Sequence, residues 1–149
     1  MHRKAEIVFA IQAIGPGQRL RLFSYFLWRL ADAQLRYTLS MTEEELVAFA
    51  LGLPDAAESA HFGTRDFRVR GKIFLTLPSH DFCVVQLKPD QQQMALATTP
   101  DMVAPVPGGW GERGSTRLFY RRADDAAIHA LVQQAWKNST PKSMIAKED

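Results

Sequence analysis

Two groups of basic side chains are the residues best suited to bind a charged ligand. The first group contains Arg65, Arg68, Arg70 and Lys72, in a stretch where polar and apolar residues alternate. The second contains Arg113, Arg117, Arg121 and Arg122, which follow a glycine-rich stretch. Clustered cations of this kind neutralise phosphates and give salt-dependent, largely sequence-independent affinity for nucleic acid. They are also typical of solvated strand faces and of protected sheet edges, so both interpretations stay open.

Two tryptophans have different expected roles. Trp110 stands between glycines in a proline-rich stretch. An exposed indole there would be a stacking platform for bases, whereas an indole folded inward would anchor the loop. Trp136 repeats with apolar neighbours at helical spacing and is predicted to lie in the core.

The sequence offers little for catalysis or metal binding. His61 is a candidate base, but no nucleophile or orienting acid is identifiable for it, and serine- and cysteine-type sites require both. His80 is predicted in a turn, and His129 on a helix without a metal-spaced partner. The single cysteine, Cys83, lies in an apolar run and is predicted to be a buried structural thiol. We therefore expect no enzymatic activity, no cofactor and no metal site.

Charge is distributed unevenly along the 149 residues, whose net charge is +2. Residues 1–40 contain six basic and two acidic residues, a net charge of +4. The remainder contains 12 basic and 14 acidic residues, a net charge of −2. Nucleic-acid binding by the remainder would thus depend on a local basic patch and not on its overall charge.

The first forty residues form a distinct segment with a predicted amphipathic helix over residues 19–36. Charged residues within that helix exclude a membrane span, and no convincing secretory signal precedes it. Three interpretations stay open. Translation starts at Met41 and the segment is upstream sequence, the helix docks on the following domain, or the helix lies on an anionic membrane surface.

From residue 41 the pattern alternates between helices and strands. Helices are predicted over residues 43–53, 91–97 and 124–137, and strands over 66–70, 73–77, 82–88 and 115–121. Thr42 and the following acids are typical of a helix start. The order of elements predicts an α+β fold, in which helices pack on one side of an antiparallel sheet.

Some finer features of these elements are also predicted. Arg70-Gly71-Lys72 is expected to form a three-residue hairpin loop. Met94 and Leu96 are expected to bury the second helix. In the last strand, Arg117, Phe119 and Arg121 are expected to share one face. Residues 143–149 are expected to be a frayed tail.

Several motifs in a fixed order carry a resemblance to a known family. They are His61-Phe62-Gly63, Asp66-Phe67-Arg68-Val69, Gly71-Lys72-Ile73-Phe74, Pro107-Gly108-Gly109-Trp110-Gly111 and Ala135-Trp136. With these motifs, residues 41–142 resemble the MmcQ/YjbR family. The resemblance implies a two-layer sandwich similar to the frataxin-like CyaY superfamily, with a "double-wing" arrangement. It also implies a bacterial, cytoplasmic, DNA-binding protein.

Three functional hypotheses follow. The leading one is a non-enzymatic DNA-binding module that uses its basic hairpin faces. Its candidate contacts are Arg65, Arg68, Arg70, Lys72, Arg113, Arg117 and Arg121, with Trp110 as the stacking candidate. The alternative is a protein-interaction domain that contacts a partner through the loop from Pro105 to Gly114. The third is an enzyme that acts on a small molecule near His61.

Overall fold

The computed structural model describes residues 24–31, 40–122 and 124–146. The chain divides into two compact units, Met1–Leu39 and Ser40–Asp149, and each is described by itself. In the first unit, residues 24–31 form a helix inside the predicted range 19–36, and the rest of that prediction falls outside the described residues. No helix in the described ranges is long and apolar enough to cross a membrane.

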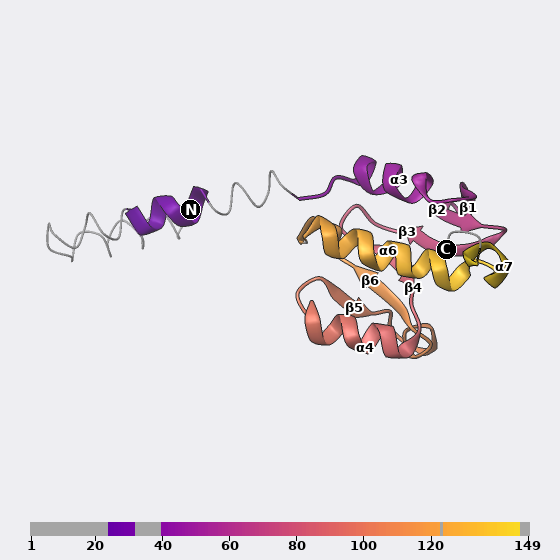
Figure 1. The fold of residues 1–149 in the computed structure, drawn as a ribbon. Helices are drawn as coiled ribbons and strands as arrows, with labels where there is room; N and C mark the ends of the chain where they lie inside the picture. The colour runs from indigo at the N-terminus through magenta and orange to yellow at the C-terminus, as the bar shows by residue number, and fades with distance from the viewer. Residues whose placement is uncertain (1–23, 32–39, 123, 147–149) are drawn as a thin grey trace, which may run out of the picture. The chain divides into compact units, whose positions relative to one another are not determined.

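The Ser40–Asp149 unit is built on a six-stranded antiparallel sheet (Figure 1). Its strands are β1 (Ala56–His61), β2 (Thr64–Val69), β3 (Lys72–Leu77), β4 (Cys83–Gln86), β5 (Val103–Pro105) and β6 (Ser115–Leu118). Their order across the sheet is β1-β2-β3-β4-β6-β5, and every neighbouring pair is antiparallel. The predicted α+β fold is therefore confirmed.

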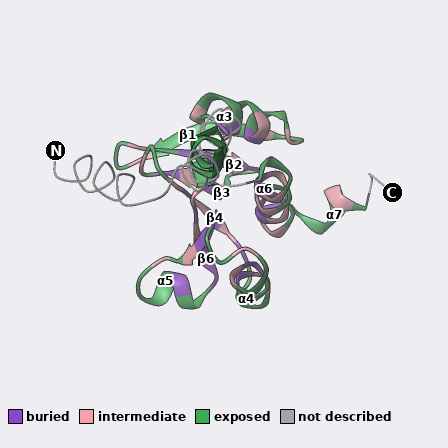
Figure 2. Ribbon diagram, turned by 90° about the vertical axis from the view of Figure 1, so that its left-hand side faces the viewer, coloured by how far each residue is buried: buried purple, intermediate pink, exposed green. Residues whose placement is uncertain are grey.

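Three longer helices cover one face of this sheet. They are α3 (Glu43–Gly52), α4 (Pro89–Thr98) and α6 (Asp125–Ser139), and shorter helical segments are α5 (Gly109–Glu112), η1 (Tyr120–Arg122) and α7 (Lys142–Ile145). Helix α6 packs on β3 and β4, α3 contacts β1, and α4 contacts β5. In Figure 2, α6 and α4 lie on one side of the strands and α5 lies on the other. The sheet thus has a face covered by long helices and an open face.

Alternation along the strands divides side chains between these two faces. Phe67, Leu75 and Val85 occupy opposite positions on neighbouring strands and are fully buried in the core. Cys83 and Trp136 also belong to the core, as predicted. Thr76 and Val84 are the sequence neighbours of Leu75 and Val85 and belong to the open face. They are therefore only partly buried.

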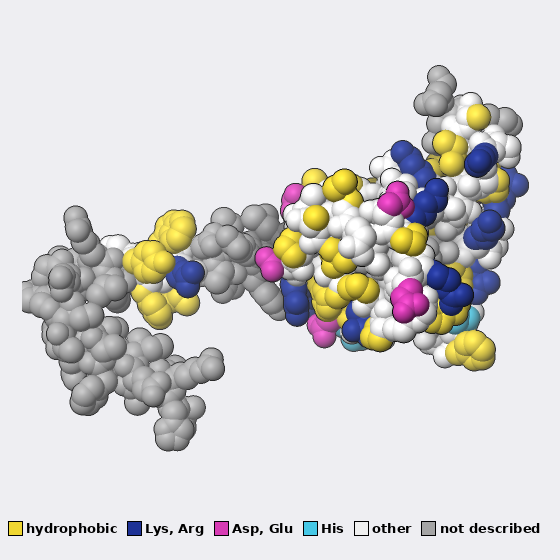
Figure 3. Space-filling view, turned by 90° about the horizontal axis from the view of Figure 1, so that it is seen from below, with side chains coloured by type: hydrophobic (Ala, Val, Ile, Leu, Met, Phe, Trp, Pro, Cys, Tyr) yellow, Lys and Arg dark blue, Asp and Glu magenta, His cyan; other side chains and the backbone are white. Residues whose placement is uncertain are grey.

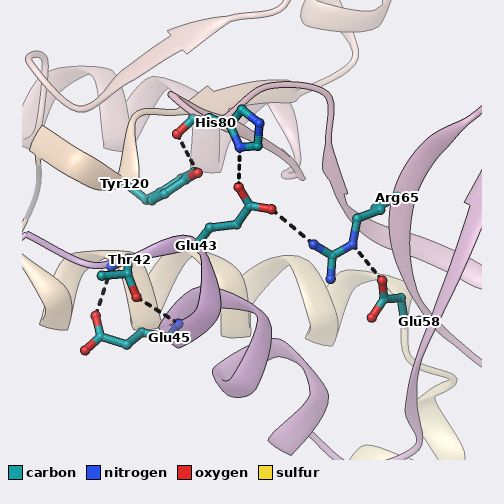
Figure 4. Close-up of polar contacts among 7 residues, drawn as sticks. All are labelled: Thr42, Glu43, Glu45, Glu58, Arg65, His80 and Tyr120. Atoms are coloured by element: carbon teal, nitrogen blue, oxygen red, sulfur yellow. Dashed lines mark hydrogen bonds and ion pairs between the residues drawn. The ribbon is translucent and has the colours of Figure 1, made fainter.

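Helix α3 begins with the features expected from its sequence. The backbone N–H of Glu45 donates to the Thr42 hydroxyl, and the Glu45 carboxylate accepts from the backbone N–H of Thr42 (Figure 4). This reciprocal capping box satisfies two N–H groups that a helix start leaves without partners. It fixes the position of Glu43, the next residue, which takes part in the ion pairs described below.

The two edge strands were not predicted from the sequence. Strand β1 consists of Ala56–His61, whose small and polar residues have little β propensity and are largely exposed. Its position is determined by pairing with β2. Strand β5 has three residues and ends at Pro105, as is typical of an edge strand.

The hairpin between β2 and β3 has a shorter loop than predicted. Only Arg70 and Gly71 connect the strands, with φ values of 51° and 82°, and Lys72 already belongs to β3. Two consecutive positive φ values are typical of a type I′ turn, which matches the twist of the flanking strands.

Two side-chain predictions were wrong. Met94 is 65% exposed, and α4 instead buries Ala95 and Gln92. Gln92 can be buried because its amide donates to the Ser115 carbonyl and the Thr116 hydroxyl. Strand β6 ends at Leu118 and a 3₁₀ turn follows, so the alternation predicted for residues 117, 119 and 121 stops there.

Candidate nucleic-acid interface

The arginines of the first basic group are held by carboxylates. Arg65 donates from Nε to Glu58 at 2.7 Å and from a terminal nitrogen to Glu43 at 3.0 Å (Figure 4). The pKa of Glu58 is lowered, chiefly by the hydrogen bond from Arg65. Arg70 pairs with Asp55 at 2.9 Å. These positive charges are therefore compensated within the domain.

Arg68 has the most buried partner of the three. Its guanidinium donates twice to Asp66, at 2.7 and 3.0 Å, and the Asp66 side chain has no exposed surface. The hydrogen bond from Arg68 is the largest influence on the pKa of Asp66 and lowers it, whereas burial opposes the shift. Asp66 is thus a buried carboxylate that stays ionised because Arg68 binds it.

The same carboxylate also binds His61. Nδ1 of His61 lies 2.7 Å from the second Asp66 oxygen, and the His61 side chain is 40% exposed. A tight turn at Phe62-Gly63 pairs His61 with Thr64, so His61 and Asp66 fall on the same face of the hairpin. The orienting acid that the sequence did not reveal is therefore Asp66. The glycine after Phe62 was the available signal, because it favours a two-residue turn.

The second basic group is arranged differently. The guanidinium of Arg113 lies 4.7 Å from the ring centre of Trp110, that of Arg117 lies 5.1 Å from Phe82, and that of Arg122 lies 4.5 Å from Phe119. Stacking on an aromatic ring stabilises a cation without cancelling its charge.

Within the described ranges, no arginine of the second group forms an ion pair. The same holds for Lys72, which is exposed. We refer to Lys72, Arg113 and Arg117 as the open-face cations. Arg117 lies on the open face opposite Val84, and Lys72 and the Arg113-stacked Trp110 line a groove that reaches from this face to the C-terminal end of α6.

Helix α5 presents Trp110 to solvent. The indole is 66% exposed, so it does not fold inward as a loop anchor. Its position is fixed by close packing at Gly111, where an added Cβ would come within 1.7 Å of the Val106 carbonyl oxygen. At Gly114 the corresponding approach to the Leu87 carbonyl oxygen is 2.0 Å. Only glycine permits these approaches, so the turn carrying Trp110 packs closely on the backbone of Val106 and Leu87.

A groove of about 630 Å³ extends from the open face to the C-terminal end of α6, and we call it the open-face groove. Neutral polar side chains and apolar side chains line most of it, with His61 and Lys72 as the ionisable groups. Its lining residues are His61, Thr64, Lys72, Ile73, Thr76, Pro78, Val84, Gln86, Val106, Trp110, Ser115, Asn138 and Ser139. The groove thus brings the predicted candidates Lys72 and Trp110 together with the candidate base His61.

Basic side chains gather on one side of the domain. Seen from below, Lys and Arg side chains concentrate on the right-hand side of the Ser40–Asp149 unit, with isolated Asp and Glu side chains among them (Figure 3). A local positive potential is therefore compatible with the net charge of −2 for the sequence after residue 40. Within the described residues, no group of three or more His, Cys, Asp or Glu side chains is placed to hold a metal ion.

An antiparallel sheet with long helices on one face and a groove on the other defines a small two-layer α+β domain. The model of the YjbR family matches residues 51–138, which is more than half of the chain. The protein therefore belongs to the YjbR family. All the motifs on which the resemblance depended lie within the matched residues.

A solved structure supports the same fold. Protein DR2400 of Deinococcus radiodurans, described by its DUF419 domain, superposes with a TM-score of 0.60 at 14% sequence identity. The match covers 70% of this chain and 82% of that chain. At this identity the likeness concerns the fold alone. No curated protein sequence matches the chain.

Proposed function

We propose that this protein is a non-enzymatic, cytoplasmic DNA-binding module whose contacts come from the open-face cations. The observation that supports the proposal is the contrast between the two basic groups. Arg65, Arg68 and Arg70 already bind carboxylates, whereas Lys72, Arg113 and Arg117 bind none among the described residues. A phosphate that approaches the open-face cations displaces counterions without separating an ion pair of the described residues, and counterion release is the source of salt-dependent affinity.

Contact through the first hairpin would be costly in comparison. A phosphate that captured Arg68 would leave the buried Asp66 carboxylate with only His61 as a partner. Removing one partner of a buried pair is destabilising by about 3–5 kcal/mol. We therefore assign the hairpin arginines a structural role and transfer the proposed DNA contacts to the open face.

The proposal is tested by fluorescence anisotropy with a duplex of about 20 base pairs, titrated between about 50 and 200 mM salt. The variants are Lys72→Gln, Arg113→Gln and Arg117→Gln, each of which removes one charge. Each is expected to weaken binding and to reduce the slope of log K against log salt by about one. Combining the three should abolish most of the salt dependence.

The matched control is Arg65→Gln, which lowers the net charge equally but removes a cation already bound to Glu58 and Glu43. It should leave the slope nearly unchanged. The proposal is wrong if the unmodified protein shows no salt-dependent binding. It is also wrong if Arg65→Gln weakens binding as much as the open-face variants do.

A second candidate function, contact with a protein partner through the Pro105–Gly114 loop, is favoured by the exposure of Trp110. Large exposed aromatic side chains often carry the binding energy of protein interfaces. The two functions are separated by Lys72→Gln, since Lys72 lies outside the loop. Loss of duplex binding in this variant favours DNA. Complete retention, together with a partner whose binding is lost on Trp110→Ala, favours the protein interface.

A further inference from the structure

Several polar groups that line the open-face groove have no hydrogen-bond partner. The Thr64 and Thr76 hydroxyls and the Gln86 amide nitrogen make no hydrogen bond with any residue in the described part of the chain. Each is neutral and partly buried. Groups of this kind provide the donors and acceptors that fix the orientation of a planar ligand.

His61 adds a hydrogen-bonding atom whose chemistry is determined by Asp66. An ionised carboxylate can only accept, so Nδ1 of His61 carries the hydrogen of the 2.7 Å bond. In the neutral imidazole, Nε2 is then an acceptor. Because Asp66 is buried and also held by Arg68, the His61 ring has a fixed orientation. The groove therefore contains a positioned imidazole nitrogen, Nε2 of His61, beside neutral polar groups.

Trp110 provides a flat apolar surface in the same groove. Trp110 is 66% exposed although its turn packs closely at Gly111, and the Arg113 guanidinium lies 4.7 Å from its ring centre. Bases stack on such indoles with little dependence on sequence, and a neighbouring arginine adds a cation for the backbone. Lys72 supplies a second cation at the groove.

We propose that the open-face groove binds the unpaired bases of single-stranded DNA. One base stacks on Trp110, base edges bond the neutral polar groups and His61 Nε2, and Lys72 and Arg113 meet the phosphates. A duplex cannot use the groove in this way, because its base faces are stacked and its Watson–Crick edges are paired. The inference rests on the proposed DNA-binding function and specifies the strand state that the groove selects.

The test compares single strands of about 12 nucleotides with a duplex of the same sequence, by anisotropy at constant salt. Trp110→Ala should weaken single-strand binding about tenfold and change duplex binding less than about twofold. His61→Gln and Thr76→Val should each weaken single-strand binding by about threefold, the usual effect of one lost neutral hydrogen bond. Quenching of indole fluorescence by the single strand should be largely lost in Trp110→Phe.

Met94→Ala is the matched control for removing an exposed apolar side chain. Met94 is 65% exposed and lies on α4, which packs with the helical layer and not on the open face. It should not change binding to either form of DNA. Far-ultraviolet circular dichroism of each variant establishes that the domain is still folded.

The outcomes separate this inference from the proposed function. If both forms bind with the salt dependence described above but Trp110→Ala weakens them equally, the single-strand inference is wrong and DNA binding stands. The inference is also wrong if the single strand binds but leaves the indole fluorescence unchanged. If neither form binds, the proposed function fails as well.

Discussion

Replacing Asp66 with Asn removes the charge that holds both His61 and Arg68 in place. The substitution preserves side-chain volume, so no cavity is created. The negative charge of Asp66 strengthens three hydrogen bonds: two from Arg68, at 2.7 and 3.0 Å, and one from His61, at 2.7 Å. The substitution removes that charge from all three. An amide also places an NH₂ group where one carboxylate oxygen accepted, and that group faces another donor.

The magnitude of the effect follows from burial. Removing one partner of a buried ion pair costs about 3–5 kcal/mol when the other charge is left dry. Here the Arg68 side chain is 31% exposed and that of His61 is 40% exposed, so water can bind both after the substitution. The expected loss in the free energy of unfolding is therefore lower, about 2–3 kcal/mol.

The loss depends on pH with a definite sign. Asp66 has a folded-state pKa below its unfolded value of about 3.9, so its carboxylate contributes fully to stability above that pH. The contribution disappears as the pH falls through the lower folded-state pKa. The difference in stability between the unmodified protein and Asp66→Asn should thus be largest near neutral pH and should narrow below about pH 4.

Urea unfolding monitored by tryptophan fluorescence measures this difference. With m values of about 1–3 kcal/mol/M, a loss of about 2–3 kcal/mol should lower the midpoint by about 0.7–3 M near neutral pH. The control is Glu58→Gln, which removes an exposed carboxylate that binds Arg65 and should cost less than about 1 kcal/mol. A loss for Asp66→Asn no larger than that of the control, or a gap that widens in acid, would refute the role assigned to the buried carboxylate.

Three further predictions concern the backbone and the thiol. Gly114→Ala should destabilise the domain by more than about 2 kcal/mol in the same urea assay, because its Cβ would come within 2.0 Å of the Leu87 carbonyl oxygen and its φ is +109°. Phe62→Asn should raise the free energy of unfolding by about 0.5–1 kcal/mol in that assay. Phe62 has a φ of 48° and is fully exposed, in a turn that favours Asn-Gly. Burial raises the pKa of Cys83, so a thiol reagent should label it in the urea-unfolded protein and not in the folded one.

The sequence predicted the parts of the fold that depend on local signals. Thr42 and the acids after it identified the start of α3, and apolar residues at helical spacing identified α6 and the burial of Trp136. Strand alternation placed Phe67 in the core. These features were accessible because caps and periodic patterns act over a few residues.

The features that were missed depend on long-range pairing. Strand β1 forms because β2 pairs with it, and its own residues give little indication of a strand. Arg65 binds two carboxylates, Glu58 and Glu43, and Glu43 is 22 positions away in sequence. The partnership of His61 with Asp66 depends on a tight turn between two strands, of which only one was recognised. The charge clusters in the sequence therefore indicated where the cations are. They did not indicate which cations pair with carboxylates and which remain able to bind a phosphate.

That distinction explains why two basic groups of similar composition receive different roles. Arg65 binds Glu58, and Arg70 binds Asp55 just before β1, so these pairs hold the edge of the sheet together. DNA that captured either arginine would leave a carboxylate close to its phosphates, and this repulsion would offset the new contact. The open-face cations carry no such cost, because aromatic stacking positions Arg113 and Arg117 while their charge remains available. In this domain the arginines suited to bind phosphate are those placed by aromatic rings, and the arginines placed by carboxylates stabilise the fold.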